Sequence, residues 1–167
     1  TSGKASPLQA NRRAVPDPYA SLPVPTLTAD PTNVSATYRG TAMVTNLPII
    51  PAVVLQPGVY DWIQIVAGRV RFNPGVYIIR GVNPVTQLAL QIIAGPVQAD
   101  GVMFYITNST SYTPSSGLPD ANDGETKPAF SVPTLAPSVV INSGVLSSSF
   151  SPLNDPASPF NGMLIYQ

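Results

Sequence analysis

The sequence predicts an all-β fold, a right-handed parallel β-helix or solenoid that follows an extended proline-rich arm. The first observation is a repeat: Pro-Gly-Val-Tyr occurs at Pro57–Tyr60 and again at Pro74–Tyr77, and apolar, largely β-branched residues follow both copies. Proline sets φ for the second position of a tight turn and glycine supplies positive φ at the third, so each copy predicts a turn that begins a strand. Identical turn–strand units are typical of a chain that coils back on itself.

The second observation is that short strand-like runs recur along the chain, and no apolar stripe has the period and length of a helix. The runs are separated by Gly, Pro, Asn or Asp every ~8–15 residues, a spacing typical of all-β domains. An antiparallel β-sandwich, in which the two Pro-Gly turns are hairpin corners, is the alternative that this pattern leaves open.

Residues 1–31 form the predicted arm, because prolines at positions 7, 16, 18, 23, 25 and 31 block the interior of both helices and strands. We expect Tyr19, Leu22 and Val24 to contact the β domain, which comprises residues 32–167. Within that domain we expect strands at 34–38, 42–44, 49–55, 62–66, 70–72, 76–80, 88–93, 102–106, 138–141, 144–146 and 163–166.

The sequence also predicts a turn and a long loop within the β domain. Asp100-Gly101 is expected to form a turn before the run at 102–106, which is apolar on both faces and therefore requires a covering layer on each side. Residues 108–128 have no periodicity and many turn formers, which predicts a long loop. Loops of this length in compact domains are usually functional or mobile.

In a coiled chain, equivalent residues of successive coils stack on one another. We therefore expect Val59 and Val76 to point inward and Tyr60 and Tyr77 to form an outward ladder. With Trp62, these tyrosines could form an aromatic platform for sugar rings, because aromatic faces give large contact areas. Packing between neighbouring strands is the simpler interpretation of the same aromatic residues.

Composition excludes several classes of function. Charged residues make up 10% of the chain, compared with roughly 25% in typical soluble domains, and eight basic residues balance eight acidic ones. This balance argues against nucleic acid as a partner, and the local cluster of Arg69, Arg71 and Arg80 is interpreted as scattered surface charge. The chain contains no cysteine and no histidine, which excludes thiolate and imidazole metal sites and histidine-activated nucleophiles.

The richest acidic patch is Asp120-Ala-Asn-Asp123-Gly-Glu, whose side-chain oxygens could surround a calcium ion. The EF-hand pattern fails, however, because Gly124 and Ser131 occupy positions that need oxygen ligands. A solvated turn is the simpler interpretation, and we expect no cofactor.

Asp61 and Asp100 lie at strand edges, where a polysaccharide-active enzyme on a β-helix could use them. Glycoside hydrolysis needs two carboxyl groups about 5–10 Å apart. Apart from Asp120 and Asp123, the sequence places no two aspartates close together, and Glu125 is its one glutamate. We therefore expect no enzymatic activity.

Five sequence blocks follow one another along the chain: Asp-Pro-Tyr-Ala-Ser-Leu-Pro-Val-Pro at 17–25, Leu-Gln-Pro-Gly-Val-Tyr at 55–60, Phe-Asn-Pro-Gly-Val-Tyr-Ile-Ile-Arg-Gly at 72–81, Gly-Val-Met-Phe-Tyr-Ile-Thr at 101–107 and Asn-Gly-Met-Leu-Ile-Tyr-Gln at 161–167. In this order they resemble the C-terminal ectodomain of TadE/TadG-like proteins, which are components of the bacterial Tad (tight adherence) Flp-pilus assembly machinery. The resemblance covers nearly the whole chain. It implies a bacterial cell-envelope protein, extracytoplasmic, with an N-terminal membrane anchor outside this sequence.

The resemblance also implies a role in pilus assembly or adhesion without catalysis, with other envelope or pilus-assembly proteins as partners. No run of 18 apolar residues is present, and we expect the chain to be a fragment or a processed ectodomain. We expect it to bind through an exposed strand edge, through the face with Tyr60, Trp62 and Tyr77, or through the loop with Asp120 and Asp123. The alternatives are a module that binds surface glycans and a diverged polysaccharide-active enzyme.

Overall fold

The computed structural model describes residues 21–45, 51–107, 109–118, 138–142 and 147–167, and these contain strands and turns but no helix. The strands are β1 (Tyr38–Thr45), β2 (Val53–Leu55), β3 (Gly58–Ala67), β4 (Val70–Phe72), β5 (Gly75–Ile79), β6 (Leu88–Ile92), β7 (Val97–Ile106), β8 (Ser138–Ile141), β9 (Ser149–Pro152) and β10 (Ile165–Tyr166). Every pairing between these strands is parallel. The all-β prediction is confirmed, and the antiparallel sandwich is wrong for the described strands.

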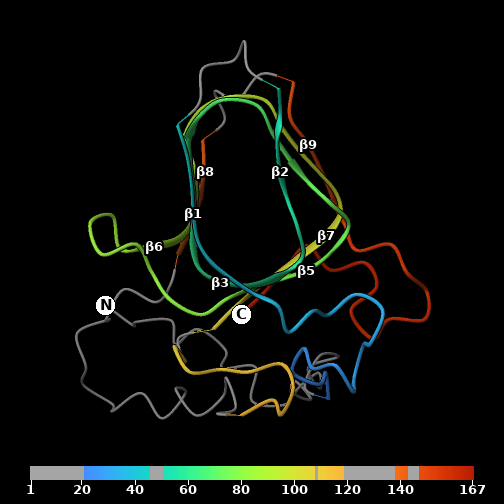
Figure 1. The fold of residues 1–167 in the computed structure, drawn as a ribbon. Coiled ribbons are helices and arrows are strands. Elements are labelled where there is room, and N and C mark those ends of the chain that lie inside the picture. The colour runs from blue at the N-terminus through green and yellow to red at the C-terminus, as the bar shows by residue number, and fades with distance from the viewer. Residues whose placement is uncertain (1–20, 46–50, 108, 119–137, 143–146) are drawn as a thin grey trace, which may run out of the picture.

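The strands lie in three stacks, which Figure 1 shows as three sides around a common interior. The β4 stack contains β2, β4, the first half of β7, and β9. The β5 stack contains the first part of β1, the first part of β3, β5, the second half of β7, and β10. The β6 stack contains the ends of β1 and β3, with β6 and β8. Along the sequence the chain passes through the β4, β5 and β6 stacks repeatedly in that order, which is why its pairings are parallel.

Both Pro-Gly-Val-Tyr copies begin strands as predicted, since β3 begins at Gly58 and β5 at Gly75. Their register differs from that of an exact repeat. Val59 pairs with Ile78 instead of Val76, whereas Leu55 pairs with Phe72 as the repeat requires. The second corner therefore contains two extra residues. Because side chains alternate with a period of two, this shift does not change which residues share a side of the stack.

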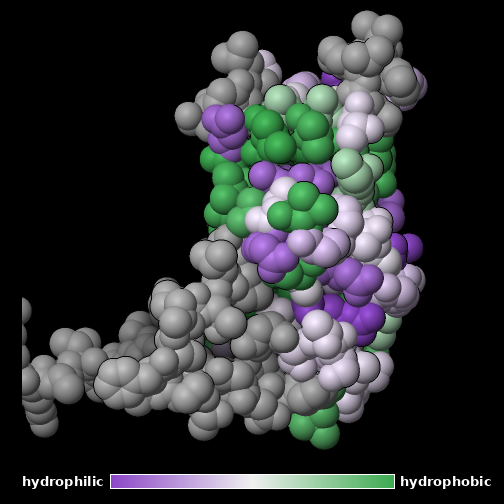
Figure 2. All heavy atoms as spheres, turned by 90° about the vertical axis from the view of Figure 1, so that its left-hand side faces the viewer, coloured by the Kyte–Doolittle hydropathy of each residue, from purple (hydrophilic) through white to green (hydrophobic). Residues whose placement is uncertain are grey.

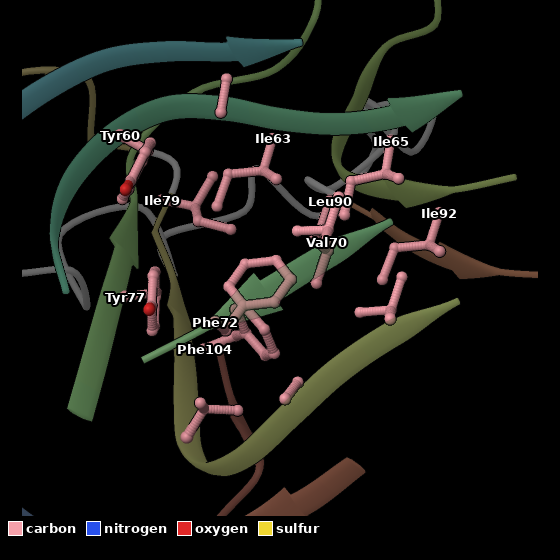
Figure 3. Packing of buried hydrophobic residues seen from close by; sticks show 14 of the residues in the cluster. Tyr60, Ile63, Ile65, Val70, Phe72, Tyr77, Ile79, Leu90, Ile92 and Phe104 are labelled. Carbon is pink, nitrogen blue, oxygen red and sulfur yellow. The ribbon is translucent and has the colours of Figure 1, made fainter. Parts of the chain in front are cut away.

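The predicted orientation of the tyrosines is wrong. Tyr60 and Tyr77 are 3% and 0% exposed and point into the interior between the stacks (Figure 3). Their rings stack with centroids 5.9 Å apart, and the Tyr77 ring lies 5.1 Å from Phe72 and 5.6 Å from Phe104. The tyrosines therefore form the centre of the core instead of an outward ladder.

The corner itself explains how a tyrosine is accommodated inside. The Tyr60 hydroxyl donates to the carbonyl oxygen of Gln56 at 2.7 Å, and the Tyr77 hydroxyl donates to that of Asn73 at 2.7 Å. Each acceptor is the residue before the proline of the same copy. The buried hydroxyl and the corner carbonyl thus satisfy each other, which removes the penalty of an unpaired polar group.

Val59 and Val76 point to the opposite side of the β5 stack, where a second layer buries them. This layer includes Val24, Tyr112 and Phe160. The predicted contact of Val24 with the β domain is confirmed; Leu22 is half-buried, and Tyr19 lies outside the described residues. The expected covering layer on both sides of 102–106 is also present, because β5 and the second half of β7 are buried throughout.

A buried polar group joins the arm to the C-terminal segment. The Asp30 carboxylate accepts hydrogen bonds from the backbone and side-chain nitrogens of Asn33 and from the hydroxyl of Ser158. Asn33 also donates to Asp155 at 2.8 Å, and this hydrogen bond, with one from the Ala157 amide, lowers the pKa of Asp155. These contacts hold the covering layer in place because they link residues far apart in the sequence.

The described part of the predicted 108–128 loop belongs to the same layer. Tyr112 is fully buried, and its hydroxyl donates to the carbonyl oxygen of Pro25 at 2.7 Å. The expected turn at Asp100-Gly101 is a bend within the continuous strand β7, with positive φ at Gly101 and a register shift between Ala99 and Val102 in the pairing with β9. Strand β9 was not predicted, and the segment 34–37 is not a strand.

Candidate functional site

The predicted aromatic platform does not form. Tyr60 and Tyr77 lie in the interior, and Trp62 is half-buried in β3 with no ring contact to either of them. Asp120 and Asp123, with the proposed calcium ligands around them, lie outside the described residues. Of the predicted interaction surface, only Trp62 and the strand edges remain as described candidates.

Burial of the two interior tyrosines predicts a loss of stability at alkaline pH. Removal from water raises the pKa of Tyr60 and of Tyr77. Because the pKa of these tyrosines is higher in the folded chain, their contribution to stability is complete below about pH 10, the ordinary tyrosine pKa. Above about pH 10 the unfolded chain releases tyrosine protons that the folded chain keeps, so the free energy of unfolding falls. We expect urea midpoints to be constant from about pH 7 to 9 and to fall from about pH 10 upward, less steeply in Tyr77→Phe. Ionisation of both tyrosines near pH 10 without unfolding, seen by tyrosinate absorbance, would contradict their burial.

Asp61 lies at the corner between the β5 and β6 stacks and is fully engaged. Its carboxylate accepts a hydrogen bond from the Tyr38 hydroxyl at 2.5 Å and one from Nε of Arg80 at 3.3 Å. The Arg80 guanidinium carbon also lies 4.8 Å from the centroid of the Tyr38 ring. The hydrogen bond to Asp61 is the main cause that raises the pKa of Tyr38. The three side chains stabilise this corner, and each oxygen of the Asp61 carboxylate accepts one hydrogen bond.

Asp100 lies at a different corner, between the β4 and β5 stacks, and accepts a hydrogen bond from the Ser149 hydroxyl at 2.9 Å. The structure therefore does not bring Asp61 and Asp100 together as the acid and base of a glycosidase. Among the residues that the structure describes, no three His, Cys, Asp or Glu side chains gather in a way that could hold a metal ion.

The outer side of the β6 stack carries a row of amides. Gln64 donates to Gln91 at 2.6 Å across the β3–β6 pair, and Asn83 donates to Gln64 at 3.0 Å. Exposed Met43 and Val140 extend this row in register on either side. Figure 2 shows this side of the molecule, with hydrophilic side chains set between hydrophobic ones. These amides hydrogen-bond to one another, so this side offers a partner mainly its exposed apolar side chains.

The outer side of the β4 stack carries the arginines. Arg71, Gln98 and Ser149 are in register there, and Arg69 precedes Arg71 by two residues. One groove of about 230 Å³ is lined by Arg71, Phe72, Pro74, Gln98 and Asp100. Another, of about 410 Å³, is lined by Arg69, Pro96, Gln98 and Ser147. Sequence reasoning grouped these arginines with Arg80, whereas the fold places Arg80 at the Asp61 corner.

The ends of the stacks form the third candidate surface. Among the described strands, β1 and β2 at one end and β8, β9 and β10 at the other pair on one side only. Several exposed apolar side chains accompany these edges: Met43, Val54, Val140, Ile141 and Ile165, which are 40% to 59% exposed. An unpaired strand edge with apolar side chains favours the addition of another strand.

None of the described segments forms a helix that could span a lipid bilayer. Comparison with protein families, with curated proteins and with solved structures finds no match to this chain.

Proposed function

We propose that the chain is a right-handed parallel β-solenoid that serves as a non-enzymatic structural and interaction module of the bacterial cell envelope. Its role is in Tad/Flp-type pilus assembly or in surface adhesion. The observation that carries this proposal is the stack architecture: three parallel stacks around one core, with strand edges and exposed apolar residues at both ends. Such a body is rigid along its length and can add an extended segment of a partner at either end.

The resemblance of the five sequence blocks to TadE/TadG-like ectodomains supports an extracytoplasmic location and envelope or pilus-assembly proteins as partners. The position of Asp61 and Asp100 at separate corners supports a role without catalysis. A turnover of polysaccharide by the purified chain that disappears in Asp61→Ala or Asp100→Ala would overturn that part of the proposal.

The test is genetic, in the bacterium that carries the gene. We expect deletion to abolish surface pili or surface attachment, and the wild-type gene to restore them. The double variant Val54→Lys/Val140→Lys, which places a charge at both strand edges, should fail to restore them. Val85→Lys is the matched control, because Val85 is 88% exposed in the turn between β5 and β6, away from the edges.

All three positions are exposed, so each lysine variant should unfold within about 0.5 kcal/mol of wild type. Circular dichroism and urea unfolding check this before the genetic test. Full piliation and attachment after deletion would overturn the assembly or adhesion role. Full restoration by the edge variant would show that the partner binds elsewhere.

A further inference from the structure

The outer side of the β4 stack carries a trough whose cations have no protein partner among the described residues. The other described arginines are engaged: Arg80 pairs with Asp61, and Arg39 donates to the carbonyl oxygen of Pro57. Arg69 and Arg71, in contrast, are exposed, and their guanidinium groups make no hydrogen bond or ion pair to the described part of the chain. Two guanidinium groups thus face solvent within a pair of adjoining grooves.

The geometry of the trough follows from the strands. Arg69 directly precedes β4 and Arg71 lies within it, so extended backbone places the two residues about 7 Å apart. Gln98 is the neighbour of Arg71 on the next strand, about 4.8 Å away between backbones, and it lines both grooves. The grooves therefore form one trough, with a cation in each half and an amide between them.

We propose that this trough binds a linear polysaccharide that bears carboxylate groups, such as a chain of uronic acids. The planar fork of each arginine fits a carboxylate through two parallel hydrogen bonds. The amide of Gln98 and the hydroxyl of Ser147 are suited to sugar hydroxyls, and Pro74 and Pro96 offer apolar surface to the rings. This site is separate from the strand edges of the proposed function, so it can be tested independently.

The remaining charge in the trough distinguishes between polyanions. Asp100 lines the half that contains Arg71. Both polymers carry a negative charge on every unit, but the internal units of inorganic polyphosphate have no hydroxyl group, so any unit that reached Asp100 would bring like charge close to its carboxylate. A uronic-acid unit carries hydroxyl groups beside its carboxylate, and a hydroxyl can donate to Asp100 while the carboxylates bind the arginines.

The experiment measures binding by isothermal titration calorimetry at low salt, with polygalacturonate as the probe. Fully methyl-esterified polygalacturonate is the neutral matched ligand. We expect wild type to bind the acid form and not the ester, and to bind more weakly as salt is added, because the trough is open to solvent. Arg69→Gln and Arg71→Gln should each weaken binding by about 5- to 10-fold, and the double variant should abolish it.

Arg39→Gln is the control variant, since it removes the same charge from another part of the surface; its affinity should stay within about 2-fold of wild type. The proposal is overturned if wild type does not bind polygalacturonate or binds the ester equally well. It is also overturned if Arg39→Gln weakens binding as much as the trough variants do, because the polyanion would then bind by nonspecific electrostatic attraction. Tighter binding of inorganic polyphosphate than of polygalacturonate would assign the trough to a different polyanion.

Discussion

Replacement of Gly95 by alanine should destabilise the fold by about 3 kcal/mol or more. Gly95 follows β6 and has a φ of +97°, an angle that residues other than glycine rarely adopt. A Cβ atom at this position would lie 1.9 Å from the carbonyl oxygen of Gly68, the corner residue after β3. The corner after β3 and the corner after β6 touch backbone to backbone here. Because the obstacle is backbone, no side-chain rotation can relieve it, and the corner would have to move apart.

Gly40→Ala separates the backbone clash from the conformational cost. Gly40 also has positive φ, +72°, but a Cβ there would meet nothing within 4 Å. This variant should cost about 1–2 kcal/mol, the usual penalty of a left-handed residue. Urea unfolding of the two variants gives the difference in free energy of unfolding. An equal cost for both would mean that the corners at Gly95 and Gly68 are not in close contact.

The sequence predicts the positions of most strands in this fold because turn residues bound each run of β-branched residues. Pro57-Gly58 and Pro74-Gly75 are the best examples, since both strands begin at the glycine. The alternation of side chains has the same period in parallel and antiparallel sheets, so it could not distinguish the observed parallel pairing from an antiparallel sandwich. Strand β9 was missed because Ser149–Pro152 is polar and ends in proline. Its neighbourhood is fixed instead by side-chain hydrogen bonds, such as that of the Gly101 amide to Ser151.

The inward or outward direction of Tyr60 and Tyr77 was beyond the sequence pattern for a physical reason. Alternation shows that Val59 and Tyr60 face opposite sides, but both sides of the β5 stack are buried, so hydrophobicity does not identify the interior. The sequence does contain one signal: in both copies the tyrosine comes four positions after the residue that precedes the proline, Gln56 in the first copy and Asn73 in the second. In the structure the tyrosine hydroxyl donates to that residue's carbonyl oxygen from the inside of the corner.

The candidate binding sites were predictable only in part. The sequence showed three nearby arginines but not that Arg80 faces Asp61 while Arg69 and Arg71 share the outer side of another stack. Strand alternation alone places Arg69 and Arg71 on one side. The partner of Arg80, Asp61, comes from β3, and this pairing depends on the register between β3 and β5.

Tyr77→Ala should cost about 4 kcal/mol in free energy of unfolding, the range for a large aromatic side chain removed from a well-packed core. The ring is fully buried and contacts the rings of Tyr60, Phe72 and Phe104. Its loss would leave a cavity at the centre of all three stacks. The neighbouring side chains cannot fill that cavity because the strands that carry them are fixed by pairing on both sides.

Two companion variants help to interpret this cost: one separates hydrogen bonding from packing, and the other is a control at an exposed tyrosine. Tyr77→Phe keeps the ring and removes the hydroxyl that donates to the carbonyl oxygens of Asn73 at 2.7 Å and Leu55 at 2.9 Å, so it should cost about 1–2 kcal/mol. Tyr38→Ala, at a side chain that is 57% exposed, should cost less than about 1 kcal/mol. If Tyr77→Ala proved no more costly than Tyr38→Ala, the ring could not lie in the interior. The outward tyrosine ladder would then be the better description, because only an exposed ring can be removed without leaving a cavity.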